Sequence, residues 1–208
     1  MNKKILVGLG LVIIFLIAST GCTETETEIT PSPQDEQSQE GENQSEQTPP
    51  PETPQLGSRQ NPAPIGTSLI YNVTNDLFCG DYSVKITVLE VIRGDEAWQM
   101  IHDANIFNDP PPQGYEYILA KIRFEYLWNS DPDRSIDISQ YSFDAFSEDG
   151  VKYESPMLVT PDPQLSTTLY PGGTKEGWGA YQVAIDDEHP LLVYDQVNGG
   201  AWFKLYYS

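Results

Sequence analysis

The sequence predicts an all-β domain, an antiparallel β-sandwich with one short helical insertion, from residue 57 to residue 208. Three observations support this fold class. After Leu56 the apolar residues recur with a period of two, which is typical of strands that bury one face. The runs are short and rich in aromatic and β-branched residues. Turn residues separate them, and seven or eight short strands punctuated in this way indicate a sandwich.

Two of the expected strands show the alternation most clearly. Val84, Ile86 and Val88 alternate with polar neighbours, and apolar residues at every second position do the same from Ile118 to Tyr126, a run long enough for a central strand. Further strands are expected at Tyr141–Phe146, Lys152–Val159, Gly177–Ile185, Leu191–Tyr194 and Ala201–Tyr207. The turns Glu148-Asp149-Gly150, Pro171-Gly172-Gly173 and Asn198-Gly199-Gly200 supply the positive-φ positions that tight connections need.

One segment between the strands has a helical pattern. Asp95 can cap a helix in which Ala97, Trp98 and Ile101 lie on one face. The run Asp109-Pro110-Pro111-Pro112 forbids its continuation. We expect this helix to pack over one end of the sandwich.

The first 22 residues have the pattern of a lipoprotein signal peptide. Lys3 and Lys4 precede an apolar run of 14 residues, which is short for a helix that spans a bilayer. The run ends in Ser19-Thr20-Gly21-Cys22, which resembles the lipobox of prokaryotic lipoproteins, although Ser19 stands where leucine is usual. In such proteins the cysteine receives the lipid and becomes the first residue of the mature chain. The sequence therefore predicts a lipid anchor at Cys22, with an uncleaved signal anchor as the alternative.

Residues 23–56 form a linker of Thr, Glu, Gln, Ser and Pro with almost no apolar residue. Because such a segment has too little to bury, we expect an extended, disordered tether. Asn43-Gln44-Ser45 in the linker and Asn72-Val73-Thr74 in the domain match the glycosylation sequon, a short pattern with many false matches. Whether Cys22 carries a lipid or the signal segment stays uncleaved as an anchor, the rest of the chain is expected on the extracytoplasmic side of the membrane.

The charge balance excludes some partners. The chain has 31 acidic and 11 basic residues, and from Gly57 onward 22 acidic residues stand against nine basic ones, a net charge near −13. Such a field repels phosphate backbones and anionic head groups, so nucleic-acid binding and electrostatic docking on lipid are disfavoured. It favours cations, basic partners or simple solubility.

Several segments of the domain resemble a known family. These are residues 57–67, Tyr82–Val88, Gly114–Ile122 and Leu169–Trp178. They are similar to the secreted immunoglobulin-like domain of unknown function found on many prokaryotic lipoproteins, a family similar in fold to an immunoprotective extracellular antigen. The resemblance implies an immunoglobulin-like sandwich at the cell surface, with no catalytic residues to transfer. Residues 95–112 and the acidic loop from Asp131 to Asp137 depart from the family pattern.

No catalytic motif is present: the chain has no nucleophile elbow, phosphate-binding glycine loop or zinc-ligand spacing. Calcium is the cofactor that the sequence leaves open, because Asp131, Asp133 and Asp137 offer clustered oxygen ligands, although the loop is not an EF-hand. Asp186, Asp187 and Glu188 form a second acidic loop. Acidic loops in a chain this acidic are usually solvated surface.

Among the four tryptophans, Trp128 is the candidate for an exposed aromatic platform, since it ends a strand beside the Asp131 loop. With Cys22 assigned to the lipid, Cys79 is left alone, either buried as a small apolar residue or free for pairing with another chain. We therefore expect a non-enzymatic, membrane-anchored binding or adhesion domain that recognises an envelope or extracellular protein through a sheet edge or end loops. The alternative is a calcium-dependent or aromatic-platform domain that binds a small ligand or carbohydrate.

Overall fold

The computed structural model describes residues 53–77 and 79–207, which lie within the compact unit Pro50–Ser208. The order of the elements in this part of the chain is β1 (Ser68–Asp76), β2 (Gly80–Arg93), α1 (Asp95–Ala104), β3 (Tyr115–Asn129), β4 (Ile136–Ser139), η1 (Gln140–Ser142), β5 (Phe143–Phe146), β6 (Ser166–Leu169), β7 (Thr174–Ala184), β8 (Leu191–Tyr194), η2 (Gln196–Asn198) and β9 (Ala201–Lys204), where η marks a 3₁₀ turn. None of the helices in the described residues is long and apolar enough for a membrane span.

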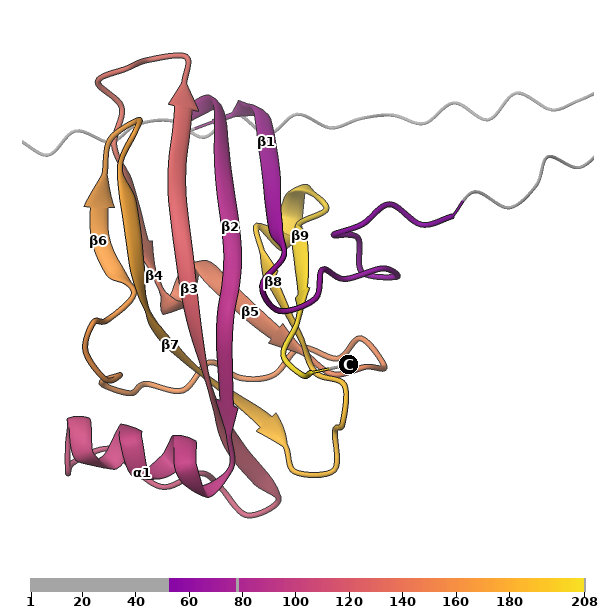
Figure 1. Ribbon diagram of the computed structural model, residues 1–208, viewed down its shortest axis with the longest axis vertical. Coiled ribbons are helices and arrows are strands. Elements are labelled where there is room, and N and C mark those ends of the chain that lie inside the picture. Colours follow the sequence, from indigo (N-terminus) through magenta and orange to yellow (C-terminus); the bar gives the residue numbers. More distant parts are fainter. Residues whose placement is uncertain (1–52, 78, 208) are drawn as a thin grey trace, which may run out of the picture. The chain divides into compact units, whose positions relative to one another are not determined.

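Most of the strands belong to two antiparallel sheets that share one core. The larger sheet has the order β1-β2-β3-β7, and the smaller sheet has the order β5-β8-β9. β4 and β6 pair with each other in a separate two-stranded sheet. Figure 1 shows the larger sheet in front, with β1 at one margin, and β5, β8 and β9 behind it. The predicted all-β antiparallel sandwich with one short helix is confirmed.

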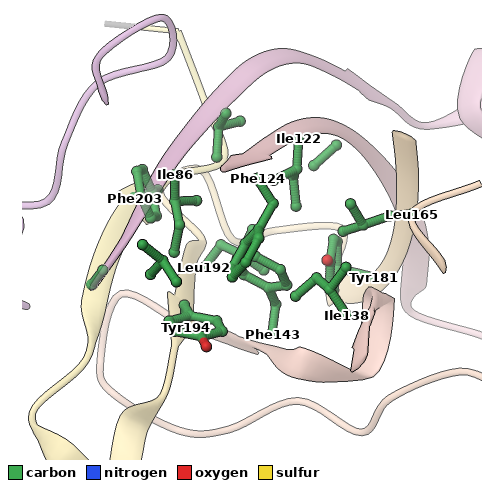
Figure 2. Close-up of a cluster of buried hydrophobic side chains, with 14 of the residues drawn as sticks. Ile86, Ile122, Phe124, Ile138, Phe143, Leu165, Tyr181, Leu192, Tyr194 and Phe203 are labelled. Atoms are coloured by element: carbon green, nitrogen blue, oxygen red, sulfur yellow. The ribbon is translucent and has the colours of Figure 1, made fainter. Parts of the chain in front are cut away.

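The core contains the residues that the alternation of the sequence marks as inward-facing. Val84, Ile86 and Val88 on β2 are fully buried, as are Ile118, Ala120, Ile122, Phe124 and Tyr126 on β3. The smaller sheet contributes Leu192, Tyr194 and Phe203, which meet them between the sheets in Figure 2. Tyr181 of β7 is also buried, and its hydroxyl has no hydrogen-bond partner among the described residues. Burial raises the pKa of this phenol well above its usual range.

The helix covers the outer face of the larger sheet at one end. Ala97 and Ile101 are buried against Tyr117 and Leu119 of β3 and Trp178 of β7. This explains why Tyr117 to Ala120 are all buried: one pair faces the sandwich core and the other faces α1. The predicted capping by Asp95 is wrong, because Gly94 occupies the N-cap position without a side-chain bond. Asp95 lies in the first turn, where a carboxylate favours the helix dipole.

Three expectations about the strands need correction. The segment Lys152–Val159 is not a strand, and Lys152 makes only an isolated bridge to Phe146. Pro156 within it has no N–H to donate, so a continuous ladder could not form there. Tyr141 lies in the 3₁₀ turn η1, and the strand that follows begins at Phe143. The short strand β4 begins at Ile136, inside the stretch Asp131 to Asp137 that was expected to be an acidic loop, and its partner β6 was not expected.

Candidate functional site

Three of the four outer edges of the two larger sheets are closed by irregular segments of the same chain. On β7, the Trp178 N–H donates to Pro163 O at 2.8 Å and its carbonyl accepts from Leu165 N at 3.0 Å. On β9, Ala63 N donates to Trp202 O at 2.9 Å. On β5, Tyr153 N donates to Ala145 O at 2.9 Å. Each closing segment satisfies backbone groups that an edge strand would otherwise leave unpaired.

The edge of β1 is different. In the part of the chain that the structure describes, β1 pairs only with β2. From Ser68 to Val73 the pairing of β1 with β2 is regular, and the side chains of this stretch carry no charge. The register shifts only between Val73 and Asp76. Proteins usually protect such edges with lysine, proline, bulges or short length, and this stretch has none of the four. Its exposed side chain Ile70 is 64% accessible. β1 is therefore an edge that can accept another strand.

A groove of about 280 Å³ lies beside this edge. Its walls are residues 55–58, Ile70 and Tyr71 of β1, and residues 198–201 of the β8–β9 connection. Trp202 N donates to Gly57 O at 2.9 Å, which ties the first wall to β9. Gly57 has φ +86°, a backbone conformation that favours glycine, and a Cβ there would lie 2.6 Å from Leu69 Cδ1, so a larger residue would also require the Leu69 side chain to move.

Tyr71 joins the two sides of the groove. Its hydroxyl donates to Asn198 O at 3.0 Å and lies 3.4 Å from Asp195 Oδ2. Asn198 Nδ2 donates to both oxygens of the same carboxylate, at 3.0 and 2.9 Å. Burial and the nearby Asp195 charge raise the pKa of Tyr71. The phenol therefore stays protonated and holds β1 against the β8–β9 connection.

A second hollow, the acidic pocket, has a volume of about 390 Å³ and lies between the β5 hairpin and the β7–β8 connection. Five carboxylates line it: Glu148, Asp149, Asp186, Asp187 and Glu188. Several of its polar groups bind one another. Tyr153 Oη donates to Asp187 Oδ2 at 2.8 Å, and His189 N donates to Asp187 Oδ1 at 3.1 Å. His189 Nδ1 lies 3.0 Å from Glu148 Oε2.

The tyrosine in the acidic pocket is held in its neutral form. Burial and the hydrogen bond to the Asp187 carboxylate raise the pKa of Tyr153 to about 12. Arg93 donates to the Asp187 carbonyl at 2.9 Å and pairs with Glu116, so its positive charge is engaged on both sides. The pocket is negative overall and suits a cation electrostatically, and of its five carboxylates Asp187 and Glu148 already have hydrogen-bond partners within it.

The structure does not gather the three aspartates proposed for calcium. Asp131 Oδ1 accepts from Asp133 N at 3.0 Å, which makes a local turn. Asp137 lies on β4 and accepts from Thr168 Oγ1 at 2.6 Å. Within residues 53–77 and 79–207, no three His, Cys, Asp or Glu side chains are grouped closely enough to hold a metal ion. Calcium binding stays a prediction that no observation here tests.

Trp128 lies near the end of β3, as expected, and is 53% accessible. It pairs with Ser83 next to a register irregularity, and none of the hollows described above includes it. Trp178 and Trp202 are buried, and Trp98 is half-buried beside the helix cluster. An exposed aromatic platform would therefore have Trp128 as its only tryptophan in the described part of the chain.

The remaining residues singled out from the sequence are the two cysteines and the two sequons. Cys22 and the sequon at Asn43 lie outside the described residues. Asn72 is exposed on β1. Cys79 is half-buried against the core and unpaired by any disulfide, and burial together with the Asp76 carboxylate raises the pKa of its thiol. It is therefore neither fully buried nor a reactive thiolate at neutral pH.

Sequence reasoning missed the two hollows for different reasons. The acidic pocket joins the turn at Glu148-Asp149 to the loop at Asp186–His189, and both segments were visible as acidic turns. A signal existed there, because both connections carry adjacent carboxylates. The groove beside β1 has no such signal, since it depends on the pairing of Gly57 with Trp202. It also includes Gln55 and Leu56, which the sequence assigned to the linker.

The scan of protein families and the comparison with curated proteins gave no match, so the family resemblance of the sequence stays a prediction. Solved structures show distant likenesses. The yjhA protein from Bacillus subtilis is 15% identical, with a TM-score of 0.42, over 70% of this chain and 99% of that one. The secreted protein MPT63 from Mycobacterium tuberculosis is 11% identical, with a TM-score of 0.45, over 69% and 97% of the two chains. A putative lipoprotein, ycdA, from Bacillus subtilis is 13% identical, with a TM-score of 0.39, over 58% of this chain and 35% of that one.

Proposed function

We propose that this protein is a lipid-anchored, non-enzymatic binding protein of the extracytoplasmic surface, whose domain captures an extended segment of another protein. The segment would pair with the backbone of β1 and continue the larger sheet. The open edge of β1 is the observation that supports this function best, because the edges of β5, β7 and β9 are closed by the chain itself. The signal peptide and Cys22 support the anchor and the location.

The groove explains how such pairing could become selective. Main-chain hydrogen bonds supply affinity that does not depend on sequence, and side-chain pockets beside the edge supply specificity. A strand added to β1 would place alternate side chains toward the groove walls at Leu56, Tyr71 and Ala201. The groove thus accepts one side chain from a peptide whose backbone lies along Ser68–Val73.

The test is selection of peptides from a randomised decapeptide library on the full chain in detergent. A selected peptide is then synthesised in two forms, N-methylated at one or the other alternate set of amides. Only one set points at β1, so we expect one form to lose at least about tenfold in affinity and the other to bind like the parent peptide. Equal binding of both forms would contradict pairing with an edge.

A matched pair of variants locates the edge on the protein. Ile70→Lys puts a charge on β1, and Ile185→Lys makes the same change at a residue of similar exposure, 64% against 60%, outside the groove. We expect Ile70→Lys to weaken the selected peptides about tenfold and Ile185→Lys to leave them unchanged. Thermal melting of both variants checks that each is folded. Equal effects from the two variants would remove β1 as the site.

A further inference from the structure

We infer that the segment captured by β1 carries an arginine or lysine, whose stem lies in the groove and whose charged head reaches Asp195. This inference rests on the proposed function and adds the chemical class of the partner. It follows from the charges around β1, from the lining of the groove and from the net charge of the domain.

Two carboxylates, those of Asp195 and Asp81, contact residues of β1. Asp195 faces the Tyr71 hydroxyl at 3.4 Å, and Asp81 binds Asn75 N at 2.7 Å near the end of β1. Lys85 lies directly opposite Ile70 on β2, but its ammonium pairs with Glu125 at 2.8 Å. An incoming strand would therefore meet negative charge along this margin, which favours basic residues and disfavours acidic ones.

Asp195 is suited to receive a cation. Its hydrogen-bond partners, Tyr71 and Asn198, are both neutral, and no basic side chain of the described residues forms an ion pair with it. The two bonds from Asn198 hold the carboxylate in place, so it needs no rearrangement to accept a guanidinium or ammonium. Leu56, Ile70 and Ala201 place apolar atoms on the walls of the neighbouring groove, against which the methylene stem can pack.

A second copy of the chain fits this edge poorly. Each domain carries a net charge near −13, so two copies would repel each other on approach. The same charge attracts a basic segment and speeds its encounter. The occupant is therefore a basic extended segment of a different protein.

The experiment measures the composition of the peptides that the library yields and the effect of Asp195→Asn on their affinity. We expect arginine and lysine to be enriched at one position, and their replacement by norleucine to weaken binding about tenfold. Asp195→Asn should cause a similar loss. The variant keeps its fold because asparagine tolerates the left-handed backbone found at residue 195, where φ is 53°. Thermal melting confirms this.

Glu188→Gln is the matched control, because it removes one negative charge from the acidic pocket and leaves the groove intact. Peptides that lose affinity with Asp195→Asn but not with Glu188→Gln support the inference. A loss of affinity with Glu188→Gln alone would place basic peptides in the acidic pocket and overturn the inference. Peptides without basic enrichment that still depend on Ile70 and on one set of amides would overturn the inference and leave the proposed function standing. A library without any peptide sensitive to Ile70→Lys would refute both.

Discussion

β1 and β7 are both outer strands of the larger sheet, yet within residues 53–77 and 79–207 the chain closes only β7. Along β7, residues 163–165 bind both backbone groups of Trp178 and bury Leu165 in the core. Along β1, no backbone of the described residues replaces the missing neighbour. The difference is not one of length, because both strands are long: β1 has 9 residues and β7 has 11. An edge of this size that remains open is available for binding or for aggregation.

The two edges show what closure requires. A closing segment must come close to the strand, and Gly177 permits this on β7, where a Cβ would lie 2.4 Å from backbone atoms of Gln164 and Leu165. β1 has no glycine between Ser68 and Asp76. The high net negative charge gives the open edge some protection, since it keeps copies of the domain apart. This repulsion does not keep a positively charged segment away from the edge of β1.

The largest effect is expected from reopening the closed edge of β7. In Gly177→Ala the new methyl group would collide with the backbone of residues 163–165, so the segment must move off the strand. Because Leu165 is buried, its displacement also removes core packing. We expect a loss of about 3 kcal/mol in the free energy of unfolding, measured by urea denaturation.

The control for this substitution is Thr174→Ala, an exposed position at the start of the same strand. It should change the free energy of unfolding by less than about 0.5 kcal/mol. The Gly177→Ala protein should also show faster hydrogen exchange at the amides of Leu165 and Trp178, which bond segment 163–165 to β7. Parental stability together with unchanged exchange would show that segment 163–165 does not close β7 in solution.

A smaller effect is expected on β9, where Ala63 supplies the closing bonds. Ala63→Pro removes the N–H that donates to Trp202 O and adds a ring at a fully buried position. Lys204 N can still donate to the carbonyl of residue 63. We expect a loss of about 2 kcal/mol and partial opening of the β9 edge, seen as faster hydrogen exchange at the amide of Lys204.

Ala63→Gly separates the hydrogen bond from the side chain, because it keeps the N–H and removes only the methyl group. It should cost about 1 kcal/mol and leave the exchange of Lys204 unchanged. If both substitutions accelerate exchange equally, the methyl group and not the hydrogen bond closes this edge.

Local patterns predicted the central part of the fold well. Val84, Ile86 and Val88 are buried as their alternation predicts, and Ala97 and Ile101 form the buried face of a helix. These features depend on neighbours in the sequence, so a single window reveals them. The four-residue strands β4 and β6 are too short to show a period, and Lys152–Val159 resembles a strand although its backbone pairs only at one end.

The candidate binding edge could be predicted only as a class of site. The sequence indicated recognition through a sheet edge or end loops, but it could not say which edge remains open. That depends on contacts between distant residues, such as Leu165 with Trp178 and Ala63 with Trp202. Which carboxylates share the acidic pocket also depends on contacts between residues that are far apart in the sequence, since Glu148 and His189 are separated by 41 positions.

The smallest effect concerns the acidic pocket, where Tyr153 and His189 bond to the carboxylates of Asp187 and Glu148. Tyr153→Phe removes the hydrogen bond to Asp187 and should cost about 1 kcal/mol at pH 7. The pKa of Tyr153 is about 12 in the folded chain, against 10.0 for an unperturbed tyrosine. Its stabilising contribution is therefore complete below pH 10 and is lost as the pH rises through 12.

The difference in stability between the parent chain and Tyr153→Phe should consequently narrow between pH 10 and pH 12 in urea denaturation. Tyr141→Phe, at an exposed tyrosine outside the acidic pocket, is the control and should differ little from the parent chain at any pH. If the difference in the free energy of unfolding between the parent chain and Tyr153→Phe stays constant across this range, the hydrogen bond from Tyr153 to Asp187 does not contribute to stability. The hydrogen bonds within the acidic pocket would then be weaker than their geometry indicates. Its carboxylates would become a second place where basic peptides could bind in competition with β1.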